Sequence, residues 1–202
     1  HMVQKDNITL KLGCEATTDI IVNEHPDEVF IAVGGENNIP NIDGVHLPHV
    51  LNAWEVLNHE QICSGQVIVI GGGMVGSETA EFLAVRGCNV TIVDMIEEVA
   101  KEESTTIKPT LFESYTKYNV GILTKMQLQK ITANHIECID ENNEPVTIPC
   151  DYVIMAAGTK SVDFDISSLK ENNINVHVIG DVKKVADINS AIEQGYLVAN
   201  NI

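Results

Sequence analysis

The stretch that decides the fold reads Val67-Ile68-Val69-Ile70-Gly71-Gly72-Gly73-Met74-Val75-Gly76. Its first four residues form a short apolar run rich in β-branched side chains, which is typical of a strand buried in a parallel sheet. The glycines that follow have the spacing Gly-x-Gly-x-x-Gly. Beyond them, small and apolar side chains recur on one helical face until Gly87, a plausible C-terminal stop. The pattern therefore predicts a strand, a tight glycine turn and a helix.

Residues 71–76, here called the glycine turn, have the features of a dinucleotide site. Gly71 allows a tight change of direction, Gly73 lets the backbone approach a diphosphate, and Gly76 lets the helix pack closely on the strand. The N-terminus of the helix adds unpaired N–H groups and a partial positive charge. Because the net charge of the chain is −17, phosphates must be held by local groups of this kind. Glycine-rich turns also join strands to helices for purely structural reasons, but the surrounding pattern favours a nicotinamide dinucleotide.

Asp94 stands at the end of the next apolar run, residues 90–93. A carboxylate at that place accepts hydrogen bonds from both ribose hydroxyls and repels a 2′-phosphate. The residues that follow, up to Glu98, carry no cation, so the sequence favours NADH over NADPH, although a lysine such as Lys101 could fold back. Glu78, which we expect in the first helical turn, could face the nicotinamide or stabilise the helix N-terminus, and both roles stay open.

Apolar runs elsewhere predict an α/β chain. We expect buried strands at residues 29–33, 67–70, 90–93, 152–157 and 176–179. Between residues 121 and 149 apolar and polar side chains alternate, and Asn142-Asn143 interrupts them like a turn, which is typical of a small antiparallel meander. The predicted fold is a Rossmann-like domain with a parallel sheet and this meander.

Composition argues against several classes of function. The chain has 202 residues, of which 44% are hydrophobic, and Arg86 is the only arginine. Because arginine is the usual means of gripping phosphates and base edges, we predict no nucleic-acid partner. We find no signal peptide and no apolar run near the roughly 20 residues that cross a bilayer, so we expect a soluble, cytoplasmic protein without a membrane partner. The five cysteines and seven histidines lack ligand spacing, so we predict no metal site.

Residues 67–80 resemble the NAD(P)H-binding domain of the two-dinucleotide-binding flavoprotein reductases. They are most similar to the carboxy-terminal flavoprotein region of the enoate reductase and 2,4-dienoyl-CoA reductase family, and residues 90–100 support this subgroup. The resemblance covers nearly the whole chain, from about Ile8 onwards. It implies an NAD(P)H-binding domain at residues 63–160, inserted into an incomplete FAD-binding domain. Residues 3–62 would hold the first part of that FAD-binding domain and a linker, and residues 161–202 its last part.

The resemblance also implies cofactor residues outside the glycine turn. Gly34 stands in a segment similar to the one where the chain leaves the FAD-binding domain, and Gly158 in one similar to the return. Gly180 and Asp181 resemble the late motif whose aspartate contacts the ribityl and phosphate part of FAD. Residues 188–195 resemble the helix that points its N-terminus at the flavin pyrimidine. Without the family, Gly180-Asp181 is simply a common turn pair after a strand.

What the chain lacks relative to this family predicts a fragment. No strand and glycine fingerprint for the FAD diphosphate precedes Ile31, and the family's flavin-binding (β/α)8 barrel with its iron–sulfur cluster is missing. The cysteines have neither cluster-ligand spacing nor the arrangement of a redox dithiol. We therefore expect this chain to bind NADH, to bind no FAD by itself and to turn over no substrate.

The activity implied for the intact protein is an electron relay. NADH would pass a hydride to FAD, and the barrel would then reduce an unsaturated acid or enoyl-CoA. Because the cofactors carry this chemistry, no acid, base or nucleophile is assigned. The implied partners are a nicotinamide dinucleotide and the flavin and iron–sulfur barrel domain of the same full-length chain. Two alternatives stay open: a non-catalytic NAD(H)-sensing domain, which Gly180-Asp181 disfavours, and part of an NADH oxidase or ferredoxin reductase.

Overall fold

The computed structural model describes residues 7–202, and its contacts divide the chain into two compact units. The split unit comprises His1–Gly35 and Ser161–Ile202, and the central unit comprises Glu36–Lys160. The predicted boundary at residue 62 differs from this division, because residues 36–62 contribute a strand and a helix to the central unit. The predicted start of the first region, at residue 3, lies outside the described residues.

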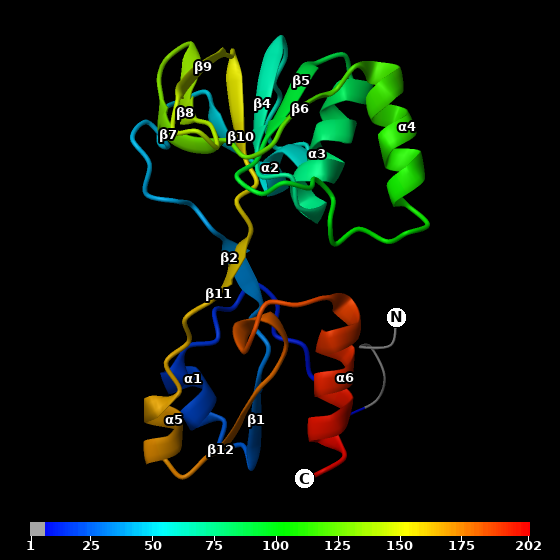
Figure 1. Cartoon of the computed structure of the whole chain (residues 1–202). Helices are drawn as coiled ribbons and strands as arrows, with labels where there is room; N and C mark the ends of the chain where they lie inside the picture. Colours follow the sequence, from blue (N-terminus) through cyan, green and yellow to red (C-terminus); the bar gives the residue numbers. More distant parts are fainter. Residues whose placement is uncertain (1–6) are drawn as a thin grey trace. The chain divides into compact units, whose positions relative to one another are not determined.

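The central unit is built on a five-stranded parallel sheet with the strand order β3-β10-β4-β5-β6 (Figure 1). The strands are β3 (Val50–Asn52), β4 (Gln66–Ile70), β5 (Asn89–Val93), β6 (Gly121–Leu123) and β10 (Tyr152–Met155). Its helices are α2 (Ala53–Leu57), α3 (Met74–Val85) and α4 (Lys108–Tyr118). The parallel neighbours β4 and β5 are joined through α3, which is the connection that the glycine turn predicted.

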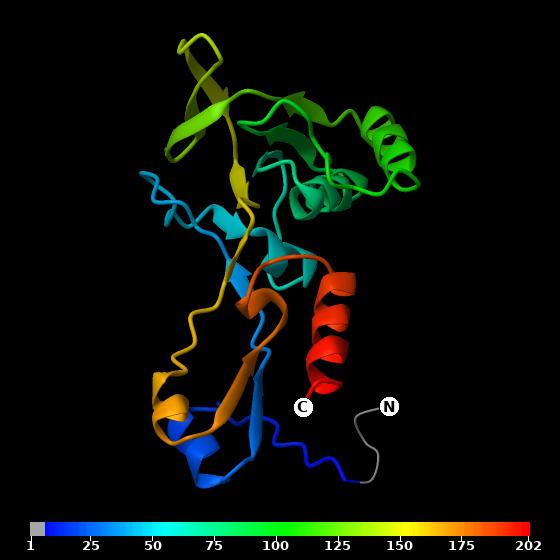
Figure 2. The ribbon, with the colours of Figure 1, turned by 60° about the horizontal axis from the view of Figure 1, so that its bottom comes forward.

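Both faces of this sheet are covered, which explains why its strands are continuous apolar runs. Val67 and Val69 of β4 pack with the helices, in one core with Leu83 of α3. The alternate residue Ile68 packs in a second core with Ile136 of the meander. Figures 1 and 2 show α3 and α4 on one face and the meander on the other. Each such buried valine or isoleucine stabilises the fold by about 1.5–3 kcal/mol.

The antiparallel meander consists of β7 (Gln127–Ile131), β8 (His135–Ile139) and β9 (Pro145–Pro149). Asp140 and Glu144 close the predicted turn between β8 and β9, where Asn143 has a φ of 62°. The prediction was wrong for residues 121–123, which form β6 at the edge of the parallel sheet. A three-residue apolar run fits either kind of strand, and pairing with β5 decides the outcome.

The split unit has a two-stranded parallel sheet of β1 (Glu28–Ile31) and β12 (Asn175–Val178). Around it lie α1 (Thr18–Asn23), α5 (Ser167–Glu171), the 3-10 turn η1 (Gly180–Val182) and α6 (Ile188–Ala199). Its small core contains Val29, Ile31 and Leu169. Where the chain passes between the units, β2 (Gly35–Asn37) and β11 (Thr159–Ser161) form a two-stranded sheet. Within residues 7–202, no helix is long and apolar enough to cross a membrane.

Candidate dinucleotide-binding site

The glycine turn connects the end of β4 to the start of α3 with backbone packed on backbone. A Cβ atom at Gly76 would lie 1.9 Å from the carbonyl oxygen of Gly71, so only glycine allows this approach. Gly71 itself has a φ of 100°, and a Cβ there would lie 2.3 Å from the carbonyl oxygen of Ala156 on β10's C-terminal side. The close helix–strand packing that the sequence predicted is therefore present.

Gly73 differs from its neighbours because it faces open space. A Cβ atom at Gly73 would meet nothing within 4 Å, and no side chain caps the helix that begins after it. The backbone N–H groups of Met74, Val75 and Gly76 occupy the first turn, where an α-helix has no internal partners for its donors. The space and the donors fit a diphosphate, which a helix N-terminus also favours electrostatically.

Gly72 hydrogen-bonds to other parts of the central unit through both of its backbone polar groups. Its N–H donates to Oδ2 of Asp94, and its carbonyl oxygen accepts from the N–H of Ala100 (2.7 Å) and the hydroxyl of Ser77 (3.0 Å). Both of its backbone polar groups are thus used inside the protein. Gly72 holds Asp94 in place, and Gly73 with the first turn of α3 remains to meet a ligand.

Asp94 follows β5 directly and is gripped by two backbone donors. Besides Gly72, the N–H of Ile96 donates to its Oδ1 at 3.0 Å. A carboxylate has about four acceptor positions, so this anchored group keeps acceptor capacity for two ribose hydroxyls. The structure therefore brings Asp94 and the glycine turn together, as the sequence predicted, through a direct bond that it did not predict.

The position of Glu78 excludes one of the two roles that the sequence left open for it. Because α3 begins at Met74, Glu78 lies in the second turn, and the first turn holds no acidic residue. Stabilisation of the helix N-terminus is therefore not its role. Its side chain is exposed, yet partial desolvation, followed by the nearby charges of Glu103 and Glu81, raises the pKa of its carboxyl above the usual value.

Two buried residues that support the turn were missed. The hydroxyl of Tyr115 on α4 donates to the carbonyl oxygen of Ser77 at 2.8 Å, and Ser77 in turn bonds to Gly72. Burial raises the pKa of Tyr115 to about 12, so the phenol keeps its proton and remains a donor at neutral pH. No spacing in the sequence links Tyr115 to the turn, because the contact depends on how α4 packs on α3.

A second candidate site lies in the split unit. An open pocket of about 290 Å³ is lined by Ala32, Gly34, Ile179, Gly180, Asp181, Ala186, Asp187, Ile188 and Ala191. It brings together three of the predicted residues: Gly34, Gly180 and Asp181. Oδ1 of Asp181 accepts from the N–H of Ala186 at 3.2 Å. Gly158 does not line this pocket; it belongs to the central unit, with a φ of 88°.

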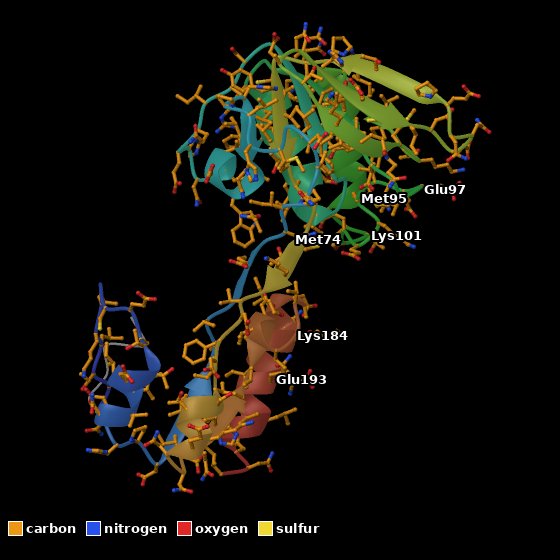
Figure 3. The ribbon with its side chains drawn as sticks, turned by 90° about the vertical axis from the view of Figure 1, so that its left-hand side faces the viewer. Met74, Met95, Glu97, Lys101, Lys184 and Glu193 are labelled. Carbon is orange, nitrogen blue, oxygen red and sulfur yellow. The ribbon has the colours of Figure 1, made fainter. Side chains whose placement is uncertain are left out.

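Exposed side chains lie at the end of the central unit that carries the glycine turn. Figure 3 shows Met74, Met95, Glu97 and Lys101 gathered there, while Lys184 and Glu193 belong to the split unit. Met74 is 43% exposed and Met95 67% exposed, so both thioethers are available to a bound group. Within residues 7–202, no three His, Cys, Asp or Glu side chains are grouped to hold a metal ion.

A strand, a glycine turn, a helix and an anchored carboxylate at the carboxyl edge of a parallel sheet define a dinucleotide-binding domain of the Rossmann type. The chain belongs to the pyridine nucleotide-disulphide oxidoreductase family, whose pattern matches residues 4–195. Family membership implies NAD(P)H and FAD as cofactors.

Individual relatives indicate which branch of the family this chain resembles. The chain is 50% identical over 196 residues to bilirubin reductase of Mediterraneibacter gnavus, which covers 96% of this chain and 30% of that protein. It is 30% identical over 198 residues to cinnamate reductase of Clostridium sporogenes, covering 96% of this chain and 29% of that protein. The structure of a 2-naphthoyl-CoA reductase in complex with 2-naphthoyl-CoA matches with a TM-score of 0.87 and 28% identity, over 96% of this chain and 30% of that one.

These relatives confirm the resemblance to the carboxy-terminal flavoprotein region of the enoate and 2,4-dienoyl-CoA reductases. They also confirm the predicted fold class, a parallel sheet with a small antiparallel meander. The chain spans about 30% of the length of these relatives.

Proposed function

We propose that this chain is the NADH-binding part of a flavoprotein reductase of unsaturated compounds. The observation that carries the proposal is the open N-terminus of α3 at Gly73, beside an Asp94 carboxylate held by the same turn. Bound NADH would supply a hydride, FAD would accept it, and the electrons would serve reduction of an unsaturated acid or enoyl-CoA in a barrel domain of the full-length chain.

The residues of this chain would act by position and charge. The first-turn N–H groups of α3 would donate to the NADH diphosphate, while the acceptor positions left on Asp94 would take the adenosine ribose hydroxyls. Since Asp94 is fixed by Gly72 and Ile96, little side-chain entropy is lost when the ribose binds. Glu78, exposed on the second turn of α3, would contact the nicotinamide end. Gly34, Gly180 and Asp181 would hold part of FAD. Gly158 would also contact a bound cofactor, as the family resemblance implies.

The substrate class rests on the relatives. Bilirubin, cinnamate and 2-naphthoyl-CoA, the compounds in their names, all contain carbonyl groups and conjugated carbon–carbon double bonds, which supports an unsaturated carbonyl compound as the substrate. All three names describe reductases, which supports a reductase over a domain that only senses NAD(H).

The first test is calorimetric titration of this chain with NADH and with NADPH. We expect saturable NADH binding and weaker NADPH binding, because Asp94 would repel the 2′-phosphate. A preference for NADPH would contradict the role proposed for Asp94, and an absence of binding to either dinucleotide would contradict the site itself.

A second test addresses the relay in the full-length, FAD-loaded protein. Anaerobic addition of NADH should bleach the flavin absorbance. A protein that binds NADH without bleaching its flavin would point to the sensing alternative.

A further inference from the structure

Lys125 lies next to the Asp94 turn, although it is far from Asp94 in the sequence. It follows β6, the strand that pairs with β5 so that Leu123 lies opposite Val93. Its backbone N–H donates to the carbonyl oxygen of Ile96 at 3.2 Å, and Lys125 has a φ of 57°, in the left-handed region. The N–H of the next residue, Met126, donates to the carbonyl oxygen of Asp94 at 2.9 Å. These backbone hydrogen bonds therefore fix Lys125 beside the segment that follows Asp94, the residue predicted to bind the ribose.

The ammonium group of Lys125 is held by two carboxylates from different segments. Its Nζ lies 3.3 Å from Oε1 of Glu97 and 3.1 Å from Oε2 of Glu141. Glu97 belongs to the segment after Asp94, at the end of the central unit where Figure 3 places it, and Glu141 belongs to the turn between β8 and β9. Hydrogen bonds to these carboxylates raise the pKa of Lys125, so it is a cation at neutral pH.

We propose that Glu97 and Glu141 sequester Lys125 from the 2′-phosphate of NADPH, so that the preference for NADH depends on this three-residue cluster as well as on Asp94. The inference rests on the proposed NADH site. The 2′ hydroxyl of a ribose held by Asp94 would lie near the segment after Asp94, which Lys125 contacts through the carbonyl oxygen of Ile96. With two carboxylates on one ammonium, the cluster presents a net negative charge to a 2′-phosphate instead of a free cation. We call Glu97, Lys125 and Glu141 the selectivity cluster.

The ion pairs of the selectivity cluster are weak enough for Lys125 to exchange partners. All three side chains are substantially exposed, at 41% for Lys125, 81% for Glu97 and 59% for Glu141. Exposed ion pairs contribute little to stability because water screens both charges. A doubly charged phosphate is a strong alternative partner for an ammonium group. Neutralising the two carboxylates should therefore release Lys125 to a 2′-phosphate without unfolding the turn.

The experiment compares NADPH affinity across matched variants of this chain, with NADH as the internal reference. In the Glu97→Gln/Glu141→Gln variant the dissociation constant for NADPH should fall about fivefold, on the scale of two exposed pairs. Adding Lys125→Gln should remove the gain. Glu98→Gln is the matched control, because it removes one charge from the same segment but from the carboxylate that pairs with Lys108, and it should give no gain.

Three outcomes would overturn the proposal. They are no NADPH gain in the double variant, a gain that survives Lys125→Gln, and a gain that Lys101→Gln removes instead. The second would mean simple relief of repulsion, and the third would make Lys101 the phosphate partner. Wild-type binding of NADH separates failure of the proposed function from failure of the selectivity cluster. If the wild-type chain binds no NADH, the proposed function fails; if it binds NADH and the double variant gains nothing, only the cluster fails. Should the double variant fold poorly, Glu97→Gln alone, at the more exposed carboxylate, should still give a smaller gain.

Discussion

The glycine turn of the central unit and the pocket of the split unit both depend on glycines, but for different reasons. In the turn, a Cβ at Gly76 would strike the backbone at 1.9 Å, so the surrounding packing demands glycine. In the pocket, a Cβ at Gly34 would meet nothing within 4 Å, and only its φ of 80° favours glycine. Close packing of neighbouring atoms requires glycine at the first site, whereas backbone conformation alone favours glycine at the second.

The hydrophobic core that supports the glycine turn is also more extensive than the core that supports the pocket. The sheet of the central unit is covered on both faces, and Ser77 and Tyr115 brace its turn from below. The split unit has a two-stranded sheet, and α6 beside its pocket has no buried residue, with Ile188 79% exposed and Ile192 66% exposed. We therefore expect this chain by itself to bind its dinucleotide in the central unit and not to hold FAD in the split unit.

The largest expected effect comes from Gly76→Ala. The new methyl group must displace the Gly71 carbonyl, so the helix and strand separate and the unfolding free energy falls by about 3 kcal/mol. Urea unfolding followed by the fluorescence of Trp54, which lies in the same unit, measures this change.

Gly34→Ala is the comparison variant in the split unit. It should cost about 1–2 kcal/mol from left-handed backbone strain, with no clash to relieve. Equal losses at Gly34 and Gly76 would contradict the distinction between packing and conformation.

Gly73→Val tests the ligand-facing glycine of the same turn. Its φ of −67° suits any residue and no atom lies in the way, so the melting temperature should stay near the wild-type value. The side chain would fill the space proposed for the diphosphate, and NADH affinity should fall by about 100-fold, or 2.7 kcal/mol. Calorimetric titration measures the loss. Retained NADH affinity in a folded Gly73→Val chain would show that the dinucleotide binds elsewhere.

Asp94→Ala should weaken NADH binding by about 2 kcal/mol, the scale of a lost hydrogen bond to a charged group. The buried N–H of Gly72 also loses its acceptor, so a smaller loss of stability should accompany it. Asp94→Asn separates the two effects, because an amide oxygen can still accept from one backbone donor while the charge is gone. If Asp94→Asn binds NADPH no better than the wild type does, charge repulsion at Asp94 is not the basis of selectivity.

The sequence predicted the parts of the fold that are written into consecutive residues. The strands at β4 and β5, the glycine turn and the acid after β5 are local patterns, and each lies within a residue or two of its expected place. The predicted strand at 152–157 ends two residues early, at Met155.

The parts that were missed depend on contacts between distant segments. Tyr115 on α4 supports the glycine turn through Ser77, and Lys125, which follows β6, contacts Ile96 in the segment after Asp94. No periodicity or spacing in the sequence could reveal either contact. Val50–Asn52 is too short and too close to prolines to read as a strand, yet it pairs with β10 and carries residues 36–62 into the central unit. Tertiary pairing decides such short elements, and local preference does not.

The smallest effects concern charge, and here the two regions should respond to pH with opposite signs. At Glu78 the pKa in the folded state is raised above 4.5, so the folded chain binds more protons and its stability falls as pH rises through that raised value. Glu78→Gln should therefore stabilise the chain at pH 7 by a few tenths of a kcal/mol, since the side chain is exposed, and the difference should disappear below about pH 4.5.

Asp187, the N-cap of α6 beside the split-unit pocket, is the opposite case, because its hydrogen bonds with Ser190 lower its pKa below 3.8. The contribution of the Asp187 carboxylate to the free energy of unfolding is present above pH 3.8 and is lost as the pH falls through its lowered pKa. Asp187→Asn should therefore destabilise the chain at pH 7. Urea unfolding of Glu78→Gln at pH 7 and about pH 4, and of Asp187→Asn at pH 7 and about pH 2.5, measures the two pH dependences. If both variants shifted stability in the same direction at pH 7, the contrast would fail: carboxylates crowded beside α3 destabilise the central unit, whereas a capping carboxylate stabilises the split unit.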